Sequence, residues 1–486
     1  MDERWIEMLR SFILACYEGM FIYLVLAIVM CSVLVVAAAR TLIRGRDLDP
    51  LQYHEMLDDE LAPAVSLLVP VRNSEDTIVQ RVSCLLDIQY ARYEVIIIND
   101  GSEDGTMRRL KETYDLMPIQ SKVHYSRLGQ ETAQINGVYQ SRLHHRLIVI
   151  DKAYGGRMDS LNVGLKISQY PYIASVGPRT VLERDALVKI MKSVMDALPG
   201  EEVVACSGRV DLMAHGNTNH ADSTNNGAKR TGSTLFVMQT IEYVRAFLIS
   251  GVGLVRYNIN VLLFTAEVFG VFKKNRVLEV GGYKRDDQVA HMELVMRLQK
   301  HMKQIQERGR IIYIPDPICR VEIPGTWRQL CRQRIGWHMQ LASSLWTQRS
   351  MIFNPAYGWM GMVSIPYFIL IELLGPVLEL GAIVLFIAGI GLQLVDSNLC
   401  IILALLLTLY GSLLSASVVM FEIWCSRKAY TSREVIRLLV YACTETFWFR
   451  PLNNISRIYG MLQAMGLRKA EEKDSRHGLG ESTDQS

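Results

Sequence analysis

A carboxylate and several cationic or glycine-rich segments stand where apolar runs give way to turns. Asp100 closes the β-branched run Glu94–Ile98 and is followed by Gly101-Ser102. A carboxylate at a strand end can accept hydrogen bonds from the base or ribose of a nucleotide. Asp-Gly-Ser is equally suited to an Asx-turn or a helix N-cap, so a structural role for Asp100 stays open.

Two further turns carry chemistry that suits phosphate. In Tyr172–Leu187 an apolar run ends at Gly177-Pro178-Arg179 before a helix-like segment. A guanidinium pairs well with phosphate oxygens, so Arg179 could face a diphosphate, and a solvated arginine is the alternative. Gly155-Gly156 would let the backbone approach a phosphate, with the cation of Arg157 beside it.

The Gly177–Arg179 turn lacks the ligands of a magnesium ion. Magnesium is bound by oxygen atoms, usually from carboxylates and substrate phosphates. The turn offers no carboxylate and adds a fixed positive charge. We therefore expect no metal to bind there.

The elements around these residues read as an α/β domain. Val65–Val69, Glu94–Ile98 and Leu147–Ile150 are short apolar runs typical of buried strands, and Thr77–Leu86 and Leu161–Ile167 between them have helical patterns. This alternation predicts parallel strands joined by right-handed crossovers. In such sheets ligands bind at the carboxyl ends of the strands, which is where Asp100 and Arg179 fall.

Composition places this domain in a membrane protein. Half of the 486 residues are hydrophobic, and the excess is concentrated towards both ends of the chain. A net charge of +3 gives no case for nucleic-acid binding. The nine cysteines show no CxxC pairs, so neither a zinc site nor a disulfide framework is indicated.

The apolar blocks predict spans on either side of the domain. Gly19–Ala39 is long enough to cross a bilayer, and the basic cluster after it favours an uncleaved anchor over a signal peptide, with the next domain in the cytoplasm. Thr326–Leu345 is amphipathic and could lie at the membrane surface. Towards the C-terminus we expect a broken span or two short ones around Gly375-Pro376, a span at Leu399–Met420 and an interfacial segment at Val435–Phe449.

Several segments, in order from Val65 to Gly466, resemble membrane-integrated family-2 glycosyltransferases, such as cellulose, hyaluronan and poly-N-acetylglucosamine synthases. They are SLLVPVRNSEDTI, IIINDGSEDGT, GGRMDSLNVGL, GGYKRDDQVAHMELVMRL and CRQRIGWHMQ. The resemblance implies a Rossmann-like GT-A domain inserted between N-terminal and C-terminal transmembrane helices. The implied parts are an anchor (1–46), a cytoplasmic glycosyltransferase-like domain (62–346), C-terminal membrane helices (347–466) and a disordered cytoplasmic tail (467–486).

The resemblance also implies roles for individual residues. The family's counterpart of Asp100 contacts uracil or ribose, and Arg157 takes the place of a lysine. Gln333, Arg334 and Trp337 match a motif, QRxRW, that lines the acceptor channel.

Four departures fall on the catalytic motifs. The family's DxD, which holds Mg²⁺ or Mn²⁺, is Gly177-Pro178-Arg179. Its TED, which supplies the general base, is Val289-Ala290-His291, and the second arginine of QRxRW is Gly336. Glu267 stands where the family tends to have a glycine beside the acceptor. His291 could act as a base near neutral pH, or be an ordinary surface or helix-end histidine.

These departures leave three hypotheses and keep open whether the chain is an enzyme. The first is a pseudo-glycosyltransferase that retains a UDP-sugar type pocket and assists or regulates a partner polysaccharide synthase. The second is an active, metal-independent transferase that moves a sugar from a UDP-sugar to a glycan. The third is a non-catalytic scaffold or glycan-conducting subunit. All three predict a multi-pass protein of the inner (plasma) membrane that contacts lipid.

Overall fold

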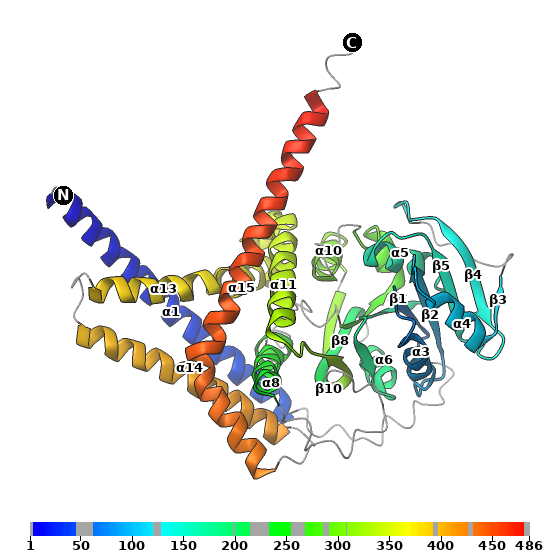
Figure 1. The fold of residues 1–486 in the computed structure, drawn as a ribbon, viewed down its shortest axis with the longest axis horizontal. Coiled ribbons are helices and arrows are strands. Elements are labelled where there is room, and N and C mark those ends of the chain that lie inside the picture. The colour runs from blue at the N-terminus through cyan, green and yellow to red at the C-terminus, as the bar shows by residue number, and fades with distance from the viewer. Residues whose placement is uncertain are drawn as a thin grey trace.

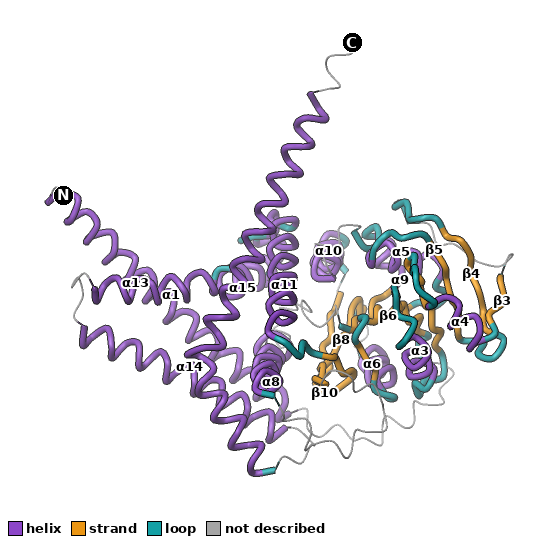
Figure 2. Tube along the Cα trace, in the orientation of Figure 1, coloured by secondary structure: helices purple, strands orange, loops and turns teal. Residues whose placement is uncertain are grey.

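A sheet domain and a set of long helices make up the structure (Figure 1). The computed structural model describes residues 3–44, 62–119, 128–197, 200–213, 233–253, 268–284, 291–307, 309–391, 397–425 and 431–480. The strands gather in one half of the molecule, while long helices alone form the other half (Figure 2).

One mixed sheet holds the ten strands of the described residues, in the order β3-β4-β5-β2-β1-β6-β9-β8-β10-β7. Strands β5, β2, β1 and β6 are parallel to one another, and the other neighbours are antiparallel except for β8 with β10. The strands are β1 (Val65–Val71), β2 (Tyr93–Asp100), β3 (Leu116–Pro118), β4 (Ile135–Ser141), β5 (Leu147–Lys152), β6 (Tyr172–Val176), β7 (Thr180–Leu182), β8 (Glu202–Met213), β9 (Phe269–Lys273) and β10 (Gly309–Glu322).

Helices cover both faces of this sheet. One face packs on α3 (Ile78–Leu86), α4 (Thr106–Tyr114) and α6 (Ala186–Met195), in a core with Leu67 and Val69 of β1. The other packs on α5 (Arg157–Ile167), α9 (Lys274–Glu279) and α10 (His291–Gln304), in a core with Leu68. Burial of both faces explains why the central strands read as continuous apolar runs.

The other half of the molecule consists largely of long helices. Helix α8 (Thr234–Ala246) runs into the π-helical segment η3 (Phe247–Gly253), and α11 (Trp327–Thr347) lies between the sheet domain and α15 in Figure 1. The remaining long helices are α1 (Glu3–Arg44), α13 (Gly375–Gly391), α14 (Ser397–Cys425) and α15 (Ser432–Gly480). Short helical turns connect α11 to α13: η5 (Arg349–Met351), η6 (Pro355–Tyr357), η7 (Met360–Ser364), α12 (Ile365–Tyr367) and η8 (Phe368–Leu373).

One described helix is long and apolar enough to cross a membrane, namely residues Leu14–Arg40 of α1. Met360–Leu373 and Gly375–Gly391 pass the same test together but are bent by 44° at the predicted Gly375-Pro376 break, and would make a second span if counted as one. Helix α1 is tied to the others by hydroxyls: Tyr17 donates to the Leu385 carbonyl at 2.7 Å, and Ser32 and Tyr410 share a hydrogen bond of 2.7 Å.

Several elements extend beyond their predicted limits, among them α1, α5, β10 and α15. Strand β10 covers Gly309–Glu322 because it pairs along the whole of β8, whereas only Ile311–Ile314 is continuously apolar. Helix α15 runs from Ser432 through Gly480, so residues 467–480, which we expected in a disordered tail, are helical here. Polar residues such as Glu445 interrupt the apolar pattern in α15, but they are paired inside the protein and the helix continues.

Candidate active site

The candidate site lies where the parallel strands end. Because β1, β2, β5 and β6 are parallel neighbours, the turns that follow them meet at one edge of the sheet. Asp100 ends β2, Gly177 follows β6, and Arg157 begins α5 after the turn that follows β5. The structure therefore brings three of the predicted positions to one edge.

Asp100 organises this edge from within. Its Oδ1 accepts hydrogen bonds from Lys152 Nζ (2.5 Å) and the Gly155 amide (2.9 Å), and its Oδ2 accepts one from the Gly156 amide (3.0 Å). Lys152 is fully buried and also pairs with Asp159 at 3.0 Å. A carboxylate has about four acceptor positions, so these three donors leave about one for a ligand. The contact of Asp100 with a nucleotide stays a prediction.

The glycine turn has a shape that only glycine adopts readily. Gly156 has φ 89° and ψ 170° and forms the N-cap of α5. Its amide and that of Gly155 both point at Asp100, which fixes the start of α5. Arg157 is thus placed in the first helical position, at the positive end of the α5 dipole.

Two arginines with different surroundings lie at the turn after β6: Arg179 belongs to the turn, and Arg81 reaches it from α3. Arg179 is exposed, and its carbonyl accepts a hydrogen bond from the Glu322 amide. The Gly177 carbonyl accepts a hydrogen bond from Arg81 Nη2 at 2.5 Å. Arg81 lies on α3, and sequence reasoning missed it. The sequence feature that could have indicated Arg81 is its place between apolar positions of the helix, because Ile78, Val82 and Leu85 are buried.

A divalent cation does not fit this turn. Residues Gly177–Arg179 offer no carboxylate. The Gly177 carbonyl is bonded to a guanidinium, and the Arg179 carbonyl accepts a hydrogen bond from the Glu322 amide. Within the described parts of the chain, no three His, Cys, Asp or Glu side chains are grouped closely enough to hold a metal ion.

His291 begins α10 and is enclosed by aromatic rings. Its ring stacks on Phe272 with centroids 6.4 Å apart and meets Tyr283 edge-on at 5.4 Å. The side chain is fully buried, and neither ring nitrogen has a hydrogen-bond partner among the described residues. Burial, assisted by the charge of Arg157, holds the pKa of His291 well below its ordinary value. At neutral pH the imidazole is therefore uncharged. Its role as a base stays a prediction.

The predicted acceptor residues lie on α11, in an interface between helices. Arg334 is almost fully buried, donates to Glu242 of α8 at 2.6 Å and stacks over the Trp337 ring at 4.2 Å. Gln333 lies within 3.5 Å of Arg334, and Trp337 also meets Tyr243 edge-on. Their acceptor role is untested. Glu267 lies outside the described residues, as do Val289 and Ala290.

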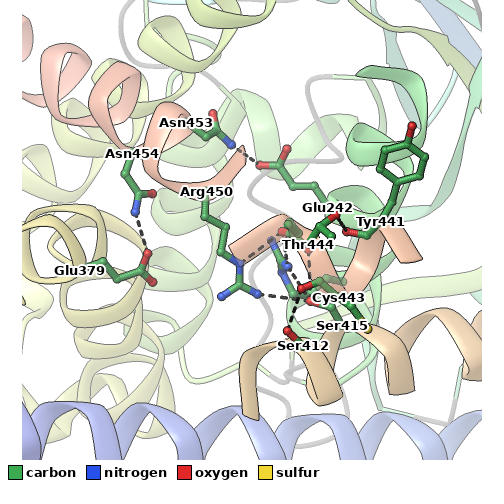
Figure 3. A network of polar contacts seen from close by, with 12 residues as sticks. Glu242, Glu379, Ser412, Ser415, Tyr441, Cys443, Thr444, Arg450, Asn453 and Asn454 are labelled. Carbon is green, nitrogen blue, oxygen red and sulfur yellow. Dashed lines mark hydrogen bonds and ion pairs between the residues drawn. The ribbon is translucent and has the colours of Figure 1, made fainter. Parts of the chain in front are cut away.

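Glu242 is the centre of a polar network that sequence reasoning did not anticipate (Figure 3). Besides Arg334 it accepts hydrogen bonds from Asn453 (3.1 Å) and Arg457 (2.8 Å), both on α15. Burial would raise the pKa of Glu242, but the cations Arg334, Arg457 and Arg245 overcome this effect and lower it to about 2. The network therefore joins α8, α11 and α15 through one ionised carboxylate.

A second part of the network ties α8 to α14 and α15. Glu445 accepts hydrogen bonds from Arg245 at 2.7 Å, from Arg450 at 3.3 Å and from Ser415 at 3.2 Å. Nearby, Asn454 donates to Glu379 of α13 at 2.6 Å (Figure 3). The arginines and carboxylates of this half of the molecule are thus largely engaged with one another.

Comparison with known proteins agrees with the motifs at the start of the sheet domain. Residues 66–141 match the family model described as glycosyl transferase family 2. These residues lie in the sheet domain, a mixed sheet with helices on both faces.

Among curated proteins, the chain is similar to poly-β-1,6-N-acetyl-D-glucosamine synthases. It is 25% identical to that of Staphylococcus aureus strain MSSA476 over 281 residues, which are 57% of this chain and 54% of the relative. It is 24% identical to that of Staphylococcus epidermidis over 288 residues, 58% of this chain and 57% of the relative. The chain thus spans about half the length of these relatives.

Among solved structures, the mannosyltransferase PcManGT from Pyrobaculum calidifontis is similar, with a TM-score of 0.47 and 15% identity. The similarity covers 86% of this chain and 99% of that one.

Proposed function

We propose that this chain is a membrane-attached pseudo-glycosyltransferase of exopolysaccharide synthesis. In this proposal its pocket binds a UDP-sugar or UDP without transferring the sugar, and the protein assists or regulates a partner synthase. The polymer named in its curated relatives makes N-acetylglucosamine the first sugar to test. The protein would reside in the inner (plasma) membrane with the sheet domain in the cytoplasm.

The observation that carries this proposal is the replacement of the family's metal-binding turn. Gly177–Arg179 has no carboxylate, and the Gly177 carbonyl is bonded to an arginine. Metal ions contribute several kcal/mol to stabilising a leaving diphosphate, and a general base contributes roughly 10²–10⁴-fold in rate. The buried, uncharged His291 supports the same conclusion, because an acceptor hydroxyl must reach its base.

A second candidate is an active, metal-independent transferase. It is favoured by the positive charge at the site, since Arg157 and Arg179 could stabilise a diphosphate without a metal, with His291 as the base. A third candidate, a scaffold or glycan-conducting subunit, would require no nucleotide at all.

Binding and turnover measured together separate the three candidates. The full chain in detergent is titrated calorimetrically with UDP and UDP-N-acetylglucosamine, with and without Mg²⁺ or Mn²⁺, and release of UDP is followed in parallel. We expect binding that is unchanged by metal and no release of UDP. Metal-independent release supports the second candidate. Absence of UDP binding supports the third candidate, and affinity that rises markedly with metal contradicts the proposal.

A further inference from the structure

Arg81 is a cation placed at the site by the fold. Helix α3 follows β1, and β1 lies beside β6, so the Arg81 side chain reaches the turn after β6. There its Nη2 bonds to the Gly177 carbonyl at 2.5 Å. This places a guanidinium at the turn where the family's metal-binding aspartates would be.

Arg81 has no carboxylate to balance its charge within the described residues. Its one hydrogen bond is to the neutral Gly177 carbonyl, and its Nε is buried without a partner. The residue nevertheless keeps part of its surface exposed. A partly buried cation without a counter-ion is costly, and an anion that reached its exposed part would remove much of this cost.

Arg157 adds a second positive charge from the opposite side of the sheet. Helix α3 packs on one face and α5 on the other, so the two arginines approach the same strand ends from different layers. Burial and the charge of Arg157 together lower the pKa of Arg81 to about 10. Because Arg157 begins α5 at the edge where Arg81 meets Gly177, a bound anion there would offset the charge of both arginines.

We propose that Arg81, together with Arg157, forms a metal-free site for the phosphate oxygens of a diphosphate. This inference rests on the proposed nucleotide pocket and assigns its anion-binding residue. Guanidinium groups pair with phosphate in a fixed geometry, and two of them offset the charge that a divalent ion would otherwise offset. Exposed Arg179 is not part of the site, because water screens its charge.

The test compares two arginines of the same edge. Full-length protein in detergent with EDTA is titrated with inorganic pyrophosphate, and separately with UDP, by calorimetry. We expect Arg81→Gln to weaken pyrophosphate binding at least tenfold, because losing a charge-assisted hydrogen bond costs more free energy than a tenfold change in Kd. Arg179→Gln should change the affinity by no more than about twofold. Arg81→Lys keeps the charge but loses the planar fork, so an intermediate loss is expected.

Folding is checked by thermal unfolding of each variant without ligand. If Arg81→Gln unfolds, Arg81→Lys carries the comparison with Arg179→Lys, and a several-fold loss confined to the Arg81 variant is the expected result. Equal losses in both variants overturn the inference. Pyrophosphate binding that appears only with added metal also overturns it.

The two probes separate this inference from the proposed function. Pyrophosphate binding that depends on Arg81, without any UDP binding, supports the anion site and contradicts the nucleotide pocket. UDP binding that is equally tight in the wild type and in Arg81→Gln supports the pocket and overturns the role of Arg81. Absence of binding by both probes overturns both.

Discussion

At the scale of single residues, a glycine turn and a set of buried charges define the edge of the sheet. Asp100, Lys152 and Asp159 form a buried chain of ion pairs that holds the glycine turn. Breaking such a buried pair costs about 3–5 kcal/mol, so these residues have a structural reason to persist whether or not a ligand binds. Identities within the GGRMDSLNVGL motif are therefore weaker evidence for catalysis than for the fold.

The buried, neutral His291 predicts how the stability of the protein depends on pH. A histidine whose folded pKa lies below its ordinary value of 6.5 stays neutral in the folded state while the unfolded chain takes up a proton, so stability is lost as pH falls below 6.5. The loss is at most about 1.4 kcal/mol per pH unit for one group. We expect His291→Leu to reduce this loss, measured as the free energy of unfolding between pH 7 and pH 5.

The same variant tests the role suggested for His291 by its position. Leucine removes two ring nitrogens that have no partner among the described residues, so at pH 7 its stability should be close to that of the wild type. An identical pH dependence in both proteins contradicts the assignment of a buried neutral imidazole. Loss of UDP-sugar turnover in the variant would instead identify His291 as the base.

At the scale of elements, the central strands and their helices follow from the sequence. The runs at Val65–Val69 and Glu94–Ile98 lie within β1 and β2, because strands buried on both faces are continuously apolar. The break at Gly375-Pro376 was also predictable, since glycine and proline mark turns and kinks by their own geometry. Helix α5 starts at Arg157, directly after the glycine pair, whereas the helical pattern covered only Leu161–Ile167.

The site was less predictable because it depends on neighbours distant in the sequence. Arg81 reaches Gly177 across 96 positions, and only the pairing of β1 with β6 brings them together. Arg334 was expected to line an acceptor channel because of its motif, and the structure pairs it with Glu242, 92 positions away. Local pattern carries no information about such partners.

Glu242 gives the prediction that belongs to this scale. Glu242→Gln leaves Arg334 and Arg457 without their shared counter-charge, and we expect a loss of about 3 kcal/mol or more in the free energy of unfolding. The folded pKa of about 2 lies below the ordinary 4.5, so the contribution of Glu242 is present above pH 4.5 and disappears as pH falls towards 2. Denaturant unfolding in detergent across this range should show the drop in the wild type and less of it in the variant.

Glu379 supplies the matched control for this measurement. It is exposed and has one hydrogen bond, from Asn454, which a glutamine oxygen can also accept. Glu379→Gln should change stability by less than about 1 kcal/mol. Comparable losses in the two variants would show that the α8–α11–α15 junction does not depend on the charge of Glu242.

At the scale of the whole molecule, the sheet domain is attached to an apolar helical half. The Leu14–Arg40 window of α1 is only 11% buried within the protein, so most of its apolar surface faces outwards. Exposed apolar residues also line α14, including Leu405, Leu409 and Leu413. Surfaces of this extent on a protein mark contact with a membrane or a partner.

Membrane attachment can be tested on the intact chain. We expect the protein to sediment with membranes and to stay there after washing with alkaline carbonate, because burial of α1 in lipid does not depend on charge. A variant with arginine at Val25 and Val29, both exposed on α1, should be released or should accumulate poorly. Full release of the unaltered chain by carbonate would contradict a membrane-spanning α1.

The 49 residues of α15 form one uninterrupted helix, and its length has a mechanical consequence. At 1.5 Å per residue it is about 70 Å long, well beyond the ~45 Å thickness of a bilayer with its headgroups. If this helix crosses a bilayer, part of it must therefore extend into water. Because Asn453 and Arg457 bond its middle to Glu242 of α8, a displacement of the protruding part would act on that carboxylate.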